Sequence, residues 1–220
     1  MTQLDREDRR ETVAIPPFAL AGILRLPAAA RGIVVFVHGS GSSRLSPRNN
    51  FVADELRKAG IASLLFDLLT EAEAADRANV FDIDLLADRL AAATGWVRKH
   101  ASTQGLPIGY FGASTGAGAA LVAAAEGHAE IAAVVSRGGR PDLARAALAR
   151  VKAPTLLIVG GDDPEVIELN RAAQRALRCE SRLAIVPGAS HLFEEPGTLE
   201  AVVALARDWF LDHFPAPRDR

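Results

Sequence analysis

The sequence predicts an α/β fold, a mostly parallel, doubly wound sheet of about seven or eight strands with helices on both faces. The first observation is a set of short apolar runs without polar alternation, which is typical of strands buried on both faces. They lie at 33–37, 63–66, 108–111, 132–135, 155–159 and 183–186. The second observation is that segments suited to helices separate them, at 50–59, 82–99, 115–125, 142–148, 165–177 and 198–213. Strand alternating with helix is typical of a parallel sheet covered on both sides.

The sequence pattern near the N-terminus predicts an antiparallel hairpin that precedes the alternating strands and helices. Two apolar runs, 12–15 and 18–24, are separated by Pro16-Pro17, and proline is tolerated at a sheet edge. A length of 220 residues and a hydrophobic content of 49% suit one α/β domain with a large core. We expect a charged tail at 1–11, a single domain at 12–214 and a short tail at 215–220.

Charge and cysteine content narrow the class of partner. The 25 basic and 27 acidic residues leave a net charge of −2, which favours neither nucleic acid nor an anionic membrane. The stretch 117–125 is too short to cross a bilayer, which needs about 20 apolar residues, so we expect no membrane insertion. The single Cys179 cannot form an internal disulfide, and the charged N-terminus is unlike a signal peptide. We expect a cytoplasmic protein with a small-molecule partner; its oligomeric state is not readable.

A G-x-S-x-G pentapeptide is the most informative motif. Gly112-Ala113-Ser114-Thr115-Gly116 directly follows the apolar run at 108–111. In this position the serine occupies a strained, positive-φ turn from strand to helix, and larger residues in place of the glycines would collide with their neighbours. The motif predicts a nucleophilic serine, Ser114.

A second motif overlaps the first. Gly112, Gly116 and Gly118 also have the G-x-x-x-G-x-G spacing of short-chain dehydrogenases. That loop normally follows the first strand of its domain, whereas about half of this chain precedes it. The dehydrogenases also need a tyrosine with a lysine four residues later, but the only tyrosine is Tyr110, and Ser114 stands four residues on. The cofactor-binding interpretation therefore lacks its catalytic residues.

Acidic and histidine partners for Ser114 follow two later strands. Ligands of open α/β sheets bind beyond the carboxyl ends of the strands, where Asp162, Asp163 and His191 lie. The order Ser, Asp, His is that of α/β-hydrolases rather than of chymotrypsin-like or subtilisin-like enzymes. An alternative stays open for Asp163, because an aspartate before Pro164 also makes a good helix cap.

The loop after the first central strand, His38-Gly39-Ser40-Gly41-Ser42-Ser43, is the candidate oxyanion loop. A tetrahedral intermediate needs two backbone N–H donors, one from the residue after the nucleophile and one from this early loop. Thr115 and Ser40 are the two candidates. A merely flexible turn would have the same composition.

Together these motifs resemble the α/β-hydrolase superfamily, and within it the small dienelactone hydrolase-like proteins. The resemblance extends from Thr12 to Phe214 and rests on His38-Gly39, the Gly112-x-Ser114-x-Gly116 elbow, Gly160-x-x-Asp163-x-x-Val166 and Pro187-Gly188-Ala189-Ser190-His191. It implies an α/β-hydrolase fold and favours Asp163 over Asp162 as the acid. Dienelactone hydrolases proper use a cysteine nucleophile, and here Ser114 stands at that position.

The resemblance implies a serine hydrolase that cleaves an ester or related acyl bond and requires no metal or organic cofactor. Only residues 136–150 separate the strand at 132–135 from the next, which leaves room for one helix and no cap domain. An open site should accept small or exposed esters. Thioester, lactone and peptide hydrolysis remain alternatives, as does a non-catalytic binding or regulatory protein on the same fold.

Two arginines, Arg137 and Arg140, are candidates for binding an anionic group of the substrate. The competing interpretation, which we favour from sequence, is that they form ion pairs with Glu194, Glu195 or Asp67. Arg44 and Arg48 are weaker candidates of the same kind, and we expect 71–77 to be a solvated charged face.

Overall fold

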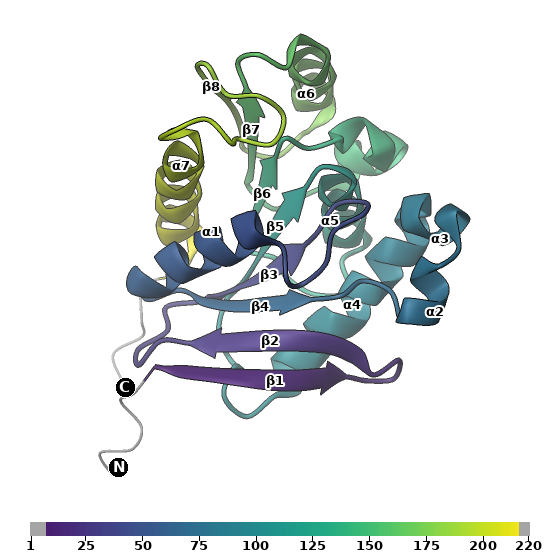
Figure 1. The fold of residues 1–220 in the computed structure, drawn as a ribbon, viewed down its shortest axis with the longest axis vertical. Helices are drawn as coiled ribbons and strands as arrows, with labels where there is room; N and C mark the ends of the chain where they lie inside the picture. The colour runs from purple at the N-terminus through teal and green to yellow at the C-terminus, as the bar shows by residue number, and fades with distance from the viewer. Residues whose placement is uncertain (1–7, 216–220) are drawn as a thin grey trace.

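The computed structural model describes residues 8–215 and contains one eight-stranded sheet (Figure 1). Its strands are β1 (Arg9–Ile15), β2 (Leu20–Leu26), β3 (Ile33–Val37), β4 (Ala62–Phe66), β5 (Ile108–Ala113), β6 (Ala133–Arg137), β7 (Thr155–Gly160) and β8 (Ser181–Val186). They lie in the order β1-β2-β4-β3-β5-β6-β7-β8. The β1–β2 and β2–β4 pairs are antiparallel, and every other pair is parallel. The predicted mostly parallel sheet with an N-terminal antiparallel hairpin is confirmed.

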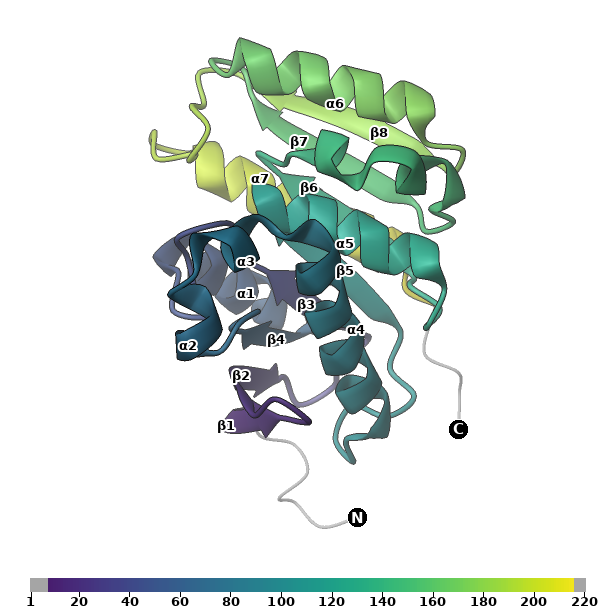
Figure 2. The same cartoon turned by 90° about the vertical axis from the view of Figure 1, so that its right-hand side faces the viewer.

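Helices cover both faces of the sheet (Figure 2). They are α1 (Pro47–Lys58), α2 (Glu71–Ala74), α3 (Arg77–Phe81), α4 (Ile83–Lys99), α5 (Thr115–Glu126), the 3-10 segment η2 (Pro141–Arg150), α6 (Pro164–Ala176) and α7 (Thr198–His213). Between β6 and β7 the chain forms only η2, which packs against α5 and α6. No cap is inserted there, as the sequence predicts. Within residues 8–215, no helix has the length and apolar character needed to span a bilayer.

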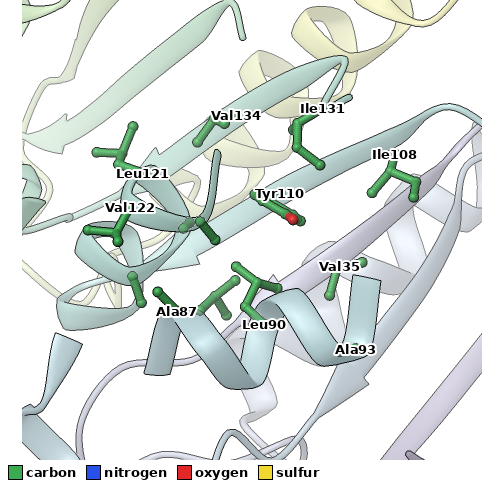
Figure 3. Packing of buried hydrophobic residues seen from close by; sticks show 14 of the residues in the cluster. Val35, Ala87, Leu90, Ala93, Ile108, Tyr110, Leu121, Val122, Ile131 and Val134 are labelled. Carbon is green, nitrogen blue, oxygen red and sulfur yellow. The ribbon is translucent and has the colours of Figure 1, made fainter. Parts of the chain in front are cut away.

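Two apolar layers hold the helices to the sheet. One layer, on the side of α4 and α5, includes Val35, Leu90, Tyr110, Leu121 and Val134, each at most 2% exposed. Figure 3 shows their packing. The other layer lies beneath α1 and α7. Because both sides of the central strands are buried, their sequences are apolar throughout, and their carboxyl ends are held in a fixed array.

Some local structure differs from the expected boundaries. Strand β1 begins at Arg9, before the expected start at residue 12, and β6 runs through Arg137 instead of ending at residue 135. The segment 71–77 is mostly exposed, as expected of a solvated charged face. It also folds into α2 and the start of α3, which the side chains of Thr70 and Asp76 cap. Of the expected tails, 1–7 and 216–220 lie outside the described residues.

Candidate active site

Ser114 occupies a strained turn between β5 and α5. Its backbone angles are φ 51° and ψ −124°. A non-glycine residue with a positive φ is strained, and residues strained in this way are concentrated at functional sites. A Cβ atom on Gly112 would lie 2.5 Å from Ala117 Cα, and one on Gly116 would lie 2.2 Å from the Val37 carbonyl oxygen. Both positions therefore require glycine, for the steric reason that the G-x-S-x-G motif predicts.

The loop after β6 holds the serine backbone from one side. The Ser114 N–H donates to the Arg137 carbonyl at 3.2 Å, and the Arg140 N–H donates to the Ser114 carbonyl at 3.0 Å. Asn170 of α6, which is fully buried, donates from Nδ2 to the Gly139 carbonyl at 3.0 Å. These bonds fix the strained turn against its neighbouring strand. Asn170 carried no sequence signal, because its role depends on where α6 packs.

Asp163 and His191 lie at the ends of β7 and β8 and are hydrogen-bonded to each other. His191 Nδ1 lies 2.7 Å from Asp163 Oδ2. Asp163 stands at the N-cap position of α6, but its side chain makes no capping hydrogen bond. The interpretation of Asp163 as a helix cap alone is therefore wrong, because its carboxylate contacts the imidazole instead. Asp162 is exposed, and its backbone N–H donates to the Ala189 carbonyl at 3.0 Å.

The hydroxyl of Ser114 has no hydrogen-bond partner among residues 8–215, His191 included. Catalytic hydrogen bonds are often long in unliganded enzymes and tighten when substrate binds. The His191 side chain is 39% exposed and the Asp163 side chain 16%, so the imidazole faces outward while its carboxylate partner is more enclosed. This arrangement leaves Nε2 of His191 as the ring nitrogen available for proton transfer.

Glu195 organises the histidine loop, a role that the sequence did not reveal. Its carboxylate accepts a hydrogen bond from the Ser190 N–H at 3.0 Å. Hydrogen bonds from Ser190 hold the pKa of Glu195 below its usual value. Ser190, the residue before His191, is thus bonded to a carboxylate five residues further along the chain.

His38 anchors the candidate oxyanion loop. Its Nδ1 lies 2.9 Å from the Gly39 carbonyl oxygen, and its Nε2 accepts a hydrogen bond from the Leu68 N–H at 3.1 Å. Accepting at Nε2 and donating at Nδ1 requires the neutral ring. Burial lowers the pKa of His38, which favours the same state. His38 therefore joins the ends of β3 and β4 and leaves no ring nitrogen for acid–base chemistry.

The two candidate oxyanion donors differ in their surroundings. Thr115 is the first residue of α5, where a backbone N–H has no partner within the helix. The Ser40 N–H, by contrast, donates to the Thr115 side-chain oxygen at 2.9 Å. The structure therefore brings the two residues together, and the Thr115 hydroxyl occupies the hydrogen-bonding position of the Ser40 N–H.

Comparison with known proteins decides the family. Residues 20–211 match the dienelactone hydrolase family. The chain belongs to the dienelactone hydrolase family. A dienelactone hydrolase from Anabaena variabilis has 55% sequence identity and a TM-score of 0.90, with coverage of 95% of this chain and 99% of that chain. The resemblance expected from the sequence motifs is confirmed.

Two further similarities are informative in different ways. A Xanthomonas campestris protein described as an α/β serine hydrolase without lid shares the fold, with 23% identity, a TM-score of 0.74, and coverage of 96% of this chain and 97% of that chain. A curated Mycobacterium tuberculosis protein named "Putative phosphoribosyl transferase" is 60% identical over 96% of this chain. The match covers 47% of that protein, so this chain spans about half the length of its curated relative.

In this dienelactone hydrolase-family chain, Arg140 and Arg137 have unlike environments. Arg140 forms a two-pronged ion pair with Asp142, at 2.9 and 2.8 Å. Arg137, the last residue of β6, is 7% exposed and has no carboxylate partner among the described residues. Its terminal nitrogen lies 3.4 Å from Asn49 Oδ1, its Nε has no partner, and its guanidinium lies 5.9 Å from the Phe193 ring centroid.

The acids expected to pair with these arginines are engaged elsewhere. Asp67 pairs with Arg44, Glu194 pairs with Arg48 at 2.8 Å, and Glu195 contacts Ser190. The expectation that Arg137 and Arg140 bridge Asp67, Glu194 or Glu195 is therefore wrong. Burial first, and the charge of Arg48 second, lower the pKa of Arg137 to about 10. A buried cation without a counter-ion is costly, which makes it a candidate for a functional role.

Two remaining features bear on ligands. A cavity of about 330 Å³ is lined by residues of β1, β2, α1 and the chain before β1, and by none of Ser114, Asp163 and His191. We therefore do not associate it with the candidate active site. Across residues 8–215, no cluster of three or more histidine, cysteine or acidic side chains has an arrangement that could hold a metal ion.

Proposed function

We propose that this hydrolase cleaves small or exposed carboxylic esters through a covalent acyl-enzyme formed on Ser114. The single observation that carries the proposal is that the three residues follow the carboxyl ends of parallel strands of one sheet, two of which, β7 and β8, are neighbours. A strained serine follows β5, while the 2.7 Å bond between Asp163 and His191 joins the ends of β7 and β8. Membership of a hydrolase family supports the same reaction class. Ser114, Asp163 and His191 are the proposed nucleophile, orienting acid and general base.

The proposed reaction has two stages. In the first, His191 accepts the proton of Ser114 as the serine oxygen attacks the ester carbonyl, and Asp163 stabilises the imidazolium. The protonated His191 then donates this proton to the leaving alcohol as the acyl-enzyme forms. In the second stage His191 takes a proton from a water molecule as the water oxygen attacks the acyl carbonyl. The protonated His191 then returns this proton to the Ser114 oxygen as the bond between the serine oxygen and the acyl carbon breaks and the acid leaves. The strain and backbone bonds at Ser114 favour this role, because they fix the backbone from which the hydroxyl projects.

Related acyl bonds use the same chemistry, so thioesters and lactones are the alternatives within the enzyme class, with peptides a third. The absence of an inserted segment between β6 and β7 favours short or exposed substrates. The name of the mycobacterial relative suggests phosphoribosyl transfer, but that name describes proteins about twice as long as the matched part. A non-catalytic protein on this fold is the rival from another class.

The test is a panel of short and long acyl esters, thioesters and lactones offered to the purified protein. We expect turnover of short-chain esters with little dependence of kcat/KM on acyl length. Turnover of thioesters or lactones but not of simple esters would show that the enzyme cleaves one of these bonds instead of a simple carboxylic ester. A folded protein that hydrolyses no member of the panel would favour the non-catalytic rival.

We further propose that Arg137 recognises an anionic group of the substrate. Its partnerless Nε and the absence of a neighbouring carboxylate among the described residues leave its charge uncompensated, and its carbonyl is bonded to the Ser114 N–H. Arg140, whose charge is compensated by Asp142, is the weaker candidate. Arg137, at the end of β6, and Arg140, three residues later, thus offer a matched comparison.

For Arg137→Gln we expect the ratio of kcat/KM on an anionic ester to that on its neutral analogue to fall by about tenfold or more, because a hydrogen bond to a charged group contributes about 1.5–3 kcal/mol. Steady-state kinetics on the two esters measure this ratio. Arg140→Gln should change it less. Equal losses of Arg137→Gln on both esters would mean that Arg137 only supports Asn49 and Phe193.

A further inference from the structure

The Thr115 side chain lies where the candidate oxyanion loop meets the nucleophile helix. Its Oγ1 accepts the hydrogen bond from Ser40 N–H at 2.9 Å, across 75 residues of sequence. Thr115 is 6% exposed, and its hydroxyl hydrogen has no acceptor among residues 8–215. A hydroxyl group offers one donor and two acceptor positions, and here only one acceptor position is used within the described part of the chain. The structure therefore leaves one buried O–H donor available beside Ser114.

The candidate oxyanion loop approaches the start of α5 closely. A Cβ atom on Gly39 would lie 3.0 Å from Ser114 Cβ, and one on Gly116 would lie 2.5 Å from the His38 carbonyl oxygen. The oxyanion loop and the start of α5 are thus in direct contact. Because the Ser40 N–H already points at Thr115 Oγ1, its hydrogen is not free to meet an oxyanion in this arrangement.

We propose that the Thr115 hydroxyl is itself an oxyanion donor, and that the hydrogen bond from the Ser40 N–H holds this hydroxyl in place. This inference rests on the proposed ester hydrolysis at Ser114. When the Ser114 oxygen bonds to the carbonyl carbon, the π electrons of the carbonyl move to its oxygen. The Thr115 backbone N–H and side-chain O–H then both donate hydrogen bonds to that oxygen. Thr115 transfers no proton, and the bonds weaken when the carbonyl re-forms and the alcohol leaves.

The Ser40 bond makes the hydroxyl a better donor in two ways. A hydroxyl whose oxygen accepts a hydrogen bond is polarised and donates more strongly. The same bond restrains the side-chain rotamer, so the donor is oriented before the charge develops, which is the condition for effective oxyanion stabilisation. Thr115 would thus supply two donors from one residue, while Ser40 acts through Thr115.

The decisive variant is Thr115→Val, which removes the hydroxyl but keeps the branched shape and the backbone N–H. It also releases the Ser40 N–H. We expect kcat on a short-chain ester to fall by about 10²-fold with little change in KM, the loss typical of one oxyanion donor. Thr115→Ser, which retains the hydroxyl, should stay within about tenfold of wild type. Thermal unfolding checks that each variant is folded, and Thr115→Ala replaces the valine variant should that one not fold.

A transition-state analogue separates a catalytic from a structural role. A trifluoromethyl ketone forms a tetrahedral oxyanion with the serine, so its affinity should fall with kcat in Thr115→Val, by about the same 10²-fold. Wild-type kcat and analogue affinity in Thr115→Val would overturn the inference and make the freed Ser40 N–H the direct donor. A wild-type protein that hydrolyses no ester would overturn the proposed function as well, so the two failures are distinguishable.

Discussion

Replacement of Ser114 by alanine is expected to lower kcat on short-chain esters by about 10⁴-fold or more, because the acyl-enzyme can no longer form. Alanine is close to serine in size, so the turn between β5 and α5 should persist with its bonds to the loop after β6. The measurement is kcat of the purified variant, with thermal unfolding as the folding control. Residual turnover within about tenfold of wild type would show that Ser114 is not the nucleophile.

Asp163→Asn is expected to reduce kcat by about 10⁴-fold while KM changes little, because the amide cannot stabilise the His191 imidazolium and favours the wrong tautomer. The reason lies in the 2.7 Å contact between Asp163 and His191 Nδ1. Since the Asp163 side chain makes no capping bond to α6, the substitution should leave the unfolding temperature nearly unchanged. Steady-state kinetics together with thermal unfolding measure both quantities.

The neighbouring Asp162 provides the matched control. It is exposed, so Asp162→Asn should leave kcat within about twofold of wild type, as is usual for a surface substitution. If Asp162→Asn lost as much activity as Asp163→Asn, or if Asp163→Asn remained fully active, the assignment of Asp163 as the orienting acid would be wrong.

The positions of the central strands along the chain were predictable from sequence for a physical reason. Strands buried on both faces must be apolar throughout, and β3 was predicted at its observed bounds, Ile33–Val37. Strand β5 extends beyond its apolar run to Ala113, because Gly112 and Ala113 pair with β6 although neither favours strands. Helices α2 and α3 have no buried residues, so no apolar periodicity marks them.

The candidate site was partly predictable, since residues that follow parallel strands must meet at one edge of the sheet. This argument identified Asp163 and His191, which the structure places in contact. It could not identify the burial of Arg137, because that depends on β6 continuing two residues further than its apolar run. Nor could it identify the bond between Ser40 and Thr115, which depends on a side-chain rotamer at the contact of two distant segments.

The central claim is that Ser114 accepts the acyl group of the substrate. The most direct test is reaction of the folded protein with a fluorophosphonate probe, followed by mass spectrometry of the digested peptides. We expect one adduct, on the peptide that contains Ser114, and none in Ser114→Ala. A folded protein that remains unlabelled at saturating probe, or that carries the adduct on another residue, would contradict the account.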